Sequence, residues 1–309
     1  MVKRPLLTTL VALLTVSSAT FFASCRQPKG GQQDSIGLAP DTFATECYTF
    51  TDTLQVIGSQ VDVSLRLAFP ASADTSALAD SIRRFLLTEL VQAAQPYFGE
   101  DEPSAIKLPE GIARTPAVLL DTVGRISMAY LTAYVDESAR EGLEVTCTND
   151  YSAAPEHQTA TFVTYSTQLY TYLGGAHGST ISAGHTFRRS DGRHMGWNMV
   201  DTTRKAELTA LIRDGLKEYF AEGEDLSTPL TDAELLDRLL LWDDPDTPED
   251  ELSDGIPLPH TAPWLTPTGV AFLYQQYEIA PYAVGMPNMT IPFEVIAPLL
   301  TAEGRSLLP

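Results

Sequence analysis

The period of the hydrophobic pattern changes along this chain, and this change most constrains what the chain can fold into. One stretch alternates apolar with polar or small residues, which predicts a half-buried strand; its apolar members are Val61, Val63, Leu65, Leu67 and Phe69. Residues 46–56 are predicted to be its hairpin partner, with Gly58 in the turn. From Leu78 to Leu90 the apolar spacing becomes helical, after a predicted N-cap at Asp74 or Thr75.

The remaining elements follow one another without a regular strand–helix–strand rhythm. Thr115-Pro116 predicts the start of a second helix, because proline suits the first helical position. The other predicted elements are strands at 143–149, 156–166, 168–173, 180–189 and 269–277, helices near 204–219 and 235–241, an acidic loop at 243–267, and a short strand and helix within 290–300. This mixture predicts an α+β fold with antiparallel sheets and packed helices, as two small domains in one compact body.

The N-terminus has the pattern of an export signal. Lys3 and Arg4 precede an uncharged and largely apolar run, which ends with the small residues Ala23 and Ser24 directly before Cys25. This arrangement predicts a lipoprotein signal peptide at residues 1–24 and a lipid on Cys25. The alternative is a plain signal peptide or an uncleaved membrane anchor, for which the apolar run is short. We therefore expect a protein of the bacterial cell envelope, lipid-anchored to a membrane and facing the periplasm or the outside.

Composition and length limit the number of domains that the mature chain can form. Residues 25–40 are polar and rich in glycine and glutamine, which predicts a flexible tether. About 270 residues then remain, enough for two small domains. We expect one domain at residues 41–190 and a second at residues 191–309.

The chain is strongly acidic. Its net charge is −20, and the leader contains Lys3 and Arg4 without an acid, so cleavage leaves −22. Such a field repels phosphates, so nucleic acid is not an expected partner. It favours a cationic protein, because opposite charges steer association. The alternative is that the acidity only keeps an envelope protein soluble.

Two cysteines follow the predicted lipidation site. Because an exported chain meets an oxidising compartment, Cys47 and Cys147 are candidates for one disulfide, which would join the first strand to the strand after the second long helix. The alternative is two separate buried thiols that pack as small hydrophobic groups.

No catalytic motif is present. The sequence contains no Gly-x-Ser-x-Gly elbow, no phosphate-binding glycine-rich loop that ends in lysine, and no His-Glu-x-x-His. His177, His185 and His194 lie close in sequence, but their spacings match no familiar metal-ligand pattern. We therefore expect a non-enzymatic protein without a metal or cofactor.

Two loops carry the candidate binding residues. Gly174, Gly175 and Gly178 indicate a tight turn with positive φ, in which His177 makes a local hydrogen bond; the alternative is a metal or general-base role for His177. In the second loop, tyrosines gather beside a proline, and such residues make good anchors for a protein partner unless they pack the loop onto the sheet. Glu278 there has no partner carboxylate for glycosidase chemistry. The candidate partner-binding residues are Gly175, His177, Tyr277 and Tyr282.

A family resemblance rests on the same two loops. The stretches YTYLGGAHGST, HTFRRSDGRHMGW and GVAFLYQQYEIAPYAVGMPNMTIPFEVI resemble the RsiV family of bacterial envelope proteins and the non-catalytic N-terminal part of the PdaC deacetylases, over roughly residues 40–303. The resemblance implies a PdaC-type domain at 41–190 followed by an RsiV-type domain at 191–309. RsiV is an anti-sigma factor that binds lysozyme with its outer part.

The resemblance carries over in part only. With 24 residues before Cys25, we do not expect the cytoplasmic segment that anti-sigma activity needs, and we do not expect the deacetylase activity either. What the resemblance implies is binding of lysozyme or of another cell-wall-related protein or glycan, by a protein anchored to the membrane through its lipid. Two alternatives stay open: a cell-wall or glycan hydrolase that uses the His177 region, and a purely structural scaffold.

Overall fold

The computed structural model describes residues 43–56, 58–93, 108–222, 229–240 and 256–308. The predicted signal peptide, the lipidation site Cys25 and the predicted tether lie outside the described residues. So does most of the acidic loop predicted at 243–267.

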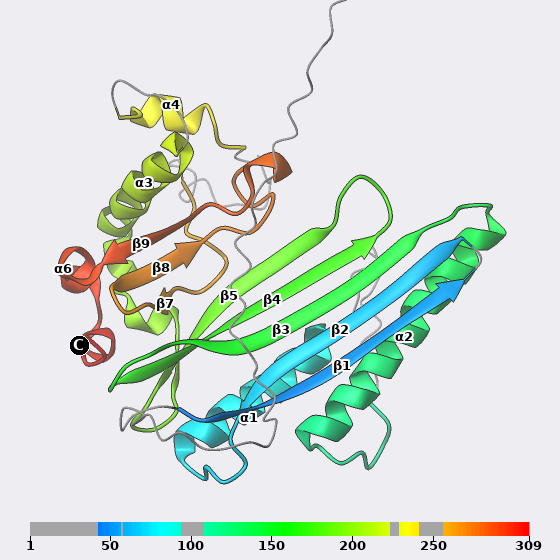
Figure 1. The fold of residues 1–309 in the computed structure, drawn as a ribbon. Helices are drawn as coiled ribbons and strands as arrows, with labels where there is room; N and C mark the ends of the chain where they lie inside the picture. Colours follow the sequence, from blue (N-terminus) through cyan, green and yellow to red (C-terminus); the bar gives the residue numbers. More distant parts are fainter. Residues whose placement is uncertain (1–42, 57, 94–107, 223–228, 241–255, 309) are drawn as a thin grey trace, which may run out of the picture.

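A six-stranded sheet runs the length of the molecule (Figure 1). Its strands lie in chain order: β1 (Thr45–Val56), β2 (Ser59–Pro70), β3 (Thr146–Gln158), β4 (Phe162–Leu173), β5 (Ser179–Arg188) and β6 (His194–Met195). Neighbours are antiparallel except β2 and β3, which are parallel because α1 (Ala77–Ala93) and α2 (Pro116–Arg140) carry the chain back between them. The α+β fold is thus confirmed, with one parallel pair that the sequence pattern did not predict.

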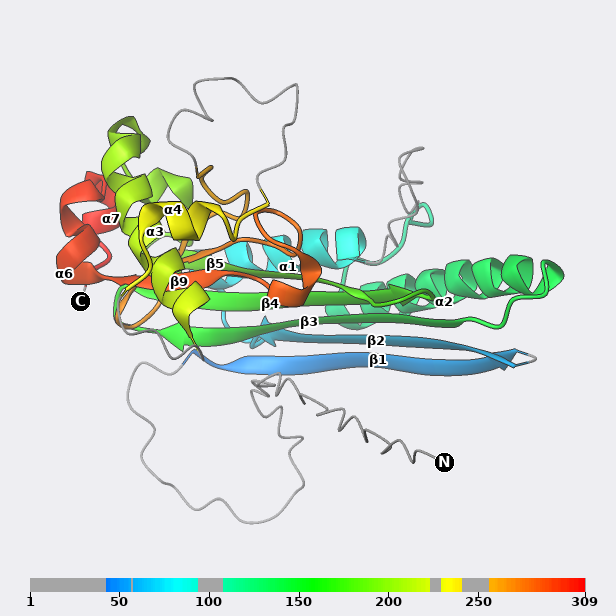
Figure 2. The ribbon, with the colours of Figure 1, turned by 90° about the horizontal axis from the view of Figure 1, so that it is seen from above.

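Both long helices cover the same face of this sheet (Figure 2). The alternating residues of β2 point into that interface and are buried, as the period of two predicted. The helical stripes meet them from the other side; they comprise Leu78, Ile82, Leu86 and Leu90 of α1 and Leu119, Val123, Leu131 and Val135 of α2. The opposite face of β1–β3 carries small hydroxyl, amide and charged side chains.

A second hydrophobic cluster lies beside β4 and β5 of this sheet (Figures 1 and 2). A three-stranded sheet of β7 (Trp264–Leu265), β8 (Gly269–Leu273) and β9 (Asn288–Pro292) packs against α3 (Lys205–Ala221). Around it lie α4 (Asp232–Leu236), α6 (Phe293–Ile296) and α7 (Ala302–Arg305), and the 3₁₀ turns η1 (Trp197–Met199), η2 (Thr202–Arg204), η3 (Tyr282–Val284) and η4 (Ala297–Leu299). Most of this cluster comes from residues 195–307, and the domain boundary at 190 stays a prediction.

The second sheet is joined to the first through β4 and β5. Thr164 Oγ1 donates to the carbonyl oxygen of Leu265 at 2.8 Å, and the Leu265 N–H donates to Thr186 Oγ1 at 2.8 Å. The ring of Trp264 lies against Gly184, where a Cβ would stand 2.2 Å from the ring. These buried contacts fix the two sheets relative to each other.

Several predicted boundaries differ from the structure. The three strands predicted between 143 and 173 are two long ones, because Pro155 is accommodated at a register shift instead of ending β3. The side chain of Ser76, rather than of Asp74 or Thr75, accepts from the Ala79 N–H in the first turn of α1. The strand predicted at 269–277 ends at Leu273.

The predicted disulfide between Cys47 and Cys147 is wrong. Cys47 is opposite Ala68 of β2, whereas Cys147 is opposite Val61, seven residues farther along the same strand. That offset is about 23 Å at ~3.3 Å per residue, and a disulfide needs Cα atoms about 4.4–6.8 Å apart. Cys147 instead has a free thiol in the helix-covered core, where burial raises its pKa to about 11.

The close packing of α2 on β1 gives a testable prediction. A Cβ on Gly124 would lie 2.3 Å from the Phe50 ring, so this helix position requires glycine. We expect Gly124→Ala to lower the free energy of unfolding by about 1–3 kcal/mol through overpacking, although alanine favours an isolated helix by about 1 kcal/mol. Urea unfolding measures the difference. Phe50→Leu in the same chain should restore part of the loss, and an equally or more stable Gly124→Ala protein would contradict the close contact.

Candidate functional site

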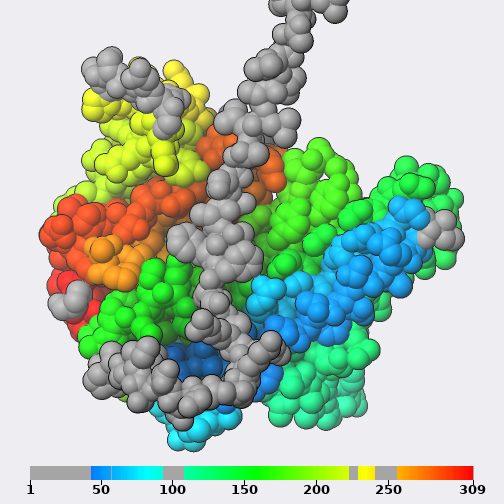
Figure 3. Space-filling view, in the orientation of Figure 1, coloured from blue at the N-terminus to red at the C-terminus, as the bar shows by residue number. Residues whose placement is uncertain are grey.

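The four candidate binding residues lie together on one exposed surface. Gly175 and His177 belong to the turn between β4 and β5, and Tyr277 and Tyr282 belong to the segment between β8 and β9. In Figure 3 the orange atoms of that segment abut the green atoms at the end of β4 and β5. Two loops about one hundred residues apart in sequence thus form a single surface.

The three rings of this surface form an aromatic cluster, defined here as His177, Tyr277 and Tyr282. The His177 and Tyr282 rings are stacked, with centroids 3.7 Å apart and planes inclined by 15°. The Tyr277 centroid lies 5.8 Å from that of Tyr282 and 6.0 Å from that of His177. Each ring therefore contacts both others, and the cluster presents a preformed shape.

Hydrogen bonds orient the imidazole. The Gly178 carbonyl oxygen can only accept, so Nδ1–H of His177 donates to it at 3.0 Å. In the neutral ring Nε2 is then the acceptor, and the Tyr277 hydroxyl donates to it at 3.0 Å. Both ring nitrogens are engaged with neutral groups, and neither contacts a carboxylate among the described residues.

The glycines of the first loop allow this geometry. Gly174 and Gly175 have φ of 87° and 92°, a region that favours glycine. The Tyr172 hydroxyl donates to the Gly175 carbonyl oxygen at 3.0 Å and closes the turn. At Gly178 a Cβ would stand 2.4 Å from the ring of Tyr170, so its absence lets that ring pack against the turn.

Tyr170 borders the aromatic cluster and escaped the sequence analysis. It lies on β4 two residues before Tyr172, so both side chains point away from α1 and α2. Partial burial raises its pKa, and the Tyr282 and Tyr172 hydroxyls nearby raise it further. The alternation of Tyr170 and Tyr172 in the sequence is the signal that would have placed both side chains on one face of the strand.

Two glutamines anchor the second loop to the first sheet. Gln275 accepts from the Ser182 N–H at 3.2 Å and donates to the Ser182 carbonyl oxygen at 2.7 Å, as a neighbouring strand would. Gln276 accepts from the Thr180 N–H at 2.9 Å. Both contacts hold the loop against the outer edge of β5, next to the His177 turn. No motif in the sequence pointed to these glutamines.

Glu278 is a structural residue of the same loop. Its carboxylate accepts from the main-chain N–H groups of Gln275 and His260, each at 2.7 Å. Its side chain is 6% exposed. The carboxylate thus shapes the loop and faces no reacting group of the cluster.

Among the residues that the structure describes, Tyr277 is the one residue other than glycine that has a positive φ, which is 66°. This left-handed conformation is strained for a residue with a side chain, by roughly 1–2 kcal/mol. Its side chain is nevertheless 46% exposed and reaches His177. A strained backbone that displays a large exposed ring is typical of binding and active sites.

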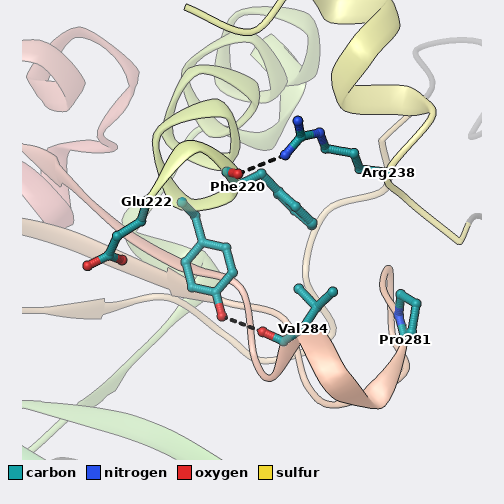
Figure 4. A pocket seen from close by; sticks show the side chains of 6 residues that line it. Phe220, Glu222, Arg238, Pro281 and Val284 are labelled. Carbon is teal, nitrogen blue, oxygen red and sulfur yellow. Dashed lines mark hydrogen bonds between the residues drawn. The ribbon is translucent and has the colours of Figure 1, made fainter. Parts of the chain in front are cut away.

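A cleft lies between the C-terminal end of α3 and η3, next to the Tyr282 loop (Figure 4). Its volume is about 660 Å³, and its lining comprises Tyr219, Phe220, Glu222, Arg238, Pro281 and Val284. The Tyr219 hydroxyl donates to the Val284 carbonyl oxygen at 2.8 Å, which ties the loop to the end of α3. Arg238 donates to the Phe220 carbonyl oxygen at 2.9 Å and caps that helix. Pro281 and Val284 thus face the cleft, whereas Tyr282 stacks on His177.

His185 and His194 lie apart from the cluster, between α1 and the sheet. Their rings are 5.5 Å apart, and the Phe85 ring contacts both. Thr167 Oγ1 is 3.0 Å from Nε2 of His185. Among the residues that the structure describes, no three histidine, cysteine or acidic side chains are placed to hold a metal, and no helix is long and apolar enough to span a membrane.

The partly buried His185 predicts a pH-dependent stability. Burial, and to a lesser degree the nearby His194, lowers its pKa from 6.5 to about 3. Between these values the unfolded chain binds more protons than the folded one, so the free energy of unfolding falls as the pH decreases. We expect His185→Phe to lose less stability than the natural chain between about pH 7 and pH 5, measured by urea unfolding. Equal losses in the two proteins would show that His185 does not cause the dependence.

Comparisons with known proteins agree with this fold. Residues 199–294, which contain Tyr277 and Tyr282 but not Gly175 or His177, match the family described as "Protein of unknown function (DUF3298)". The chain resembles a solved DUF3298 family member from Bacteroides fragilis, with 17% identity and a TM-score of 0.59 over 84% of this chain and 95% of that one. It also resembles a DUF3298 family protein from Pseudomonas aeruginosa, with 15% identity and a TM-score of 0.54 over 87% and 98%. No curated protein matches the chain. These likenesses show the fold, and residues 199–294 form a DUF3298 domain.

Proposed function

We propose that this protein is a non-enzymatic lipoprotein of the cell envelope, which binds a cationic protein through the aromatic cluster. Lysozyme is the first candidate partner, in line with the resemblance to the RsiV family and to the N-terminal part of the PdaC deacetylases. Another cell-wall-related protein or a glycan is the broader form of the same proposal. The convergence of His177, Tyr277 and Tyr282 on one exposed surface is the observation that carries it.

The shape and chemistry of the cluster favour binding. Tyrosine offers a large contact area with little side-chain entropy to lose, and stacked rings lose less still. Tyr219, Gln275 and Gln276 hold the loop from behind, so the surface is ordered before a partner arrives. Preorganisation of this kind raises affinity because less freedom is lost on association.

A hydrolase that uses His177 finds less support. A general base needs a free acceptor nitrogen and is commonly oriented by a carboxylate. Here Nε2 of His177 accepts from Tyr277, and Nδ1–H donates to a main-chain carbonyl oxygen. We therefore assign His177 to shaping the surface.

Charge favours a cationic partner over an anionic one. The chain carries a net charge of −20, so a basic protein is attracted over roughly a Debye length, about 8–10 Å at physiological salt. Such steering raises the association rate and weakens as salt is added. Binding should therefore become slower at high salt even when the aromatic contacts are unchanged.

The aromatic cluster is tested by substitution. We expect Tyr282→Ala to weaken lysozyme binding by about thirtyfold, the loss typical of a central aromatic anchor, measured by calorimetry at low salt. Tyr130→Ala is the matched control, because Tyr130 is 37% exposed on α2, an element that does not contribute to the cluster. Equal affinity for the two variants, or no lysozyme binding by the natural protein, would rule out this partner at this site.

Tyr277→Gly separates binding from folding. Glycine relieves the strained φ of 66°, which offsets the lost ring contacts, so we expect thermal stability close to that of the natural chain. Binding should nevertheless weaken, because the exposed ring is gone. A variant that unfolds early but binds normally when folded would assign Tyr277 to the fold alone.

Lipid anchoring is tested at Cys25. We expect the mature chain to begin at Cys25 with a diacylated thiol, and Cys25→Ser to prevent both modification and cleavage at this site, because the thiol carries the lipid. Mass spectrometry of the N-terminal peptide from membrane and soluble fractions measures this. An intact leader, or an unmodified Cys25 in the mature chain, would remove the anchor from the proposal.

A further inference from the structure

The first strand is an open edge of the large sheet. β1 is the terminal strand in the sheet order, and it pairs with β2 from Thr45 to Val56 without a register shift (Figure 1). Most of its residues are exposed, including Leu54 at 39%. Such a long, regular edge presents a row of main-chain groups that another strand can pair with.

The direction of these groups follows from one hydrogen bond. The Thr53 N–H donates to the Asp52 carboxylate at 2.9 Å and not to β2, so it points outward. In an antiparallel pair the main-chain groups of successive residues alternate in direction. The N–H and C=O groups of Thr49, Thr51 and Gln55 therefore also point outward. Within the described part of the chain, no hydrogen bond to the main chain of these three residues is seen from outside the β1–β2 pair.

The opposite edge of the same sheet is closed. β6 pairs with Thr186 and Phe187 of β5, and farther along β5 the side chains of Gln275 and Gln276 bond to its outward main chain. The molecule thus satisfies one sheet edge with glutamine side chains. β1 has no such cover from the described residues, and it contains no proline, lysine or bulge, the usual devices that block an edge.

The side chain of Asp52 covers one outward main-chain group of this edge. Its carboxylate holds the Thr53 N–H. Arg125 of α2 forms its ion pair with Asp121 at 2.9 Å and attracts Asp52 only weakly from a longer distance. No cation of the described residues forms an ion pair with Asp52. A cation placed beside Asp52 would compete for the carboxylate and release the Thr53 N–H for pairing.

We propose that β1 binds an extended segment of a partner protein as an added antiparallel strand, with a lysine or arginine of that segment opposite Asp52. The main-chain groups of Asp52 point to β2, so Asp52 would occupy a non-hydrogen-bonded pair with the new strand, where cross-strand side chains are closest. A second copy of this chain is disfavoured, because each copy carries −20 and the two would repel. The surface is separate from the aromatic cluster and does not depend on the function proposed for it.

A designed peptide tests the added strand. The probe is a nine-residue peptide of alternating valine and threonine with a central lysine, and the matched probe has glutamate in its place. Hydrogen exchange of the full chain is followed by NMR. With the lysine peptide we expect exchange of the Thr49, Thr51 and Thr53 amides to slow by about tenfold or more. The amides of Phe50 and Asp52, which point to β2, should not change, and the glutamate peptide should protect less.

Two variants at one position give the matched control. Thr51→Pro removes an outward N–H and blocks an added strand, while the β1–β2 ladder keeps its hydrogen bonds. Thr51→Ala keeps the N–H and should behave as the natural chain does. Circular dichroism verifies that both variants are folded. Equal protection in the proline and alanine variants, or no protection with the lysine peptide, would overturn the proposal. Protection that appears without peptide and rises with protein concentration would also overturn it, because the occupant would then be a second copy.

Discussion

A short chain of buried hydrogen bonds between the two sheets is the contact on which the rest of this structure depends. Thr164 and Thr186 lie side by side on β4 and β5, with their hydroxyl oxygens 3.0 Å apart, and together they bind both main-chain polar groups of Leu265. Each buried hydrogen bond contributes only about 1 kcal/mol net, but leaving one of these groups unpaired would cost more. The aromatic cluster is built from a turn of the first sheet and a loop of the second, so its shape requires this junction.

The loop between β8 and β9 illustrates how a rigid support and a strained residue coexist. Glu278 organises the loop through two main-chain N–H groups, and Gln275 and Gln276 attach it to β5. With the loop held in this way, Tyr277 adopts a left-handed backbone conformation and keeps its ring at the surface. Strain of this kind persists only where neighbouring contacts determine the conformation. The arrangement is what a preformed binding surface needs, and the same contacts leave His177 without a free acceptor nitrogen for base chemistry.

Different side chains cover the two edges of the large sheet, and this difference affects what each edge can bind. Glutamine side chains close the β5 edge because the second sheet lies beside it, so the same residues satisfy the edge and position the aromatic loop. At β1 a single carboxylate, Asp52, occupies one outward N–H. An acidic group at the edge of a strongly acidic protein favours a basic segment over another copy of the chain. The difference between the two edges therefore affects which partner the sheet can bind as well as how the chain folds.

The sequence by itself determined the elements and the candidate residues, because these depend on local patterns. The alternation of Val61 to Phe69 and the helical spacing of Leu78 to Leu90 report burial directly, and glycines 174 and 175 marked a turn that has positive φ. Tertiary structure alone decided which distant residues meet. The stacking of His177 on Tyr282, the parallel pairing of β2 with β3 and the separation of Cys47 from Cys147 all depend on strand register and on the junction of the two sheets. Register and junction result from packing over the whole chain, and a local pattern carries no record of them.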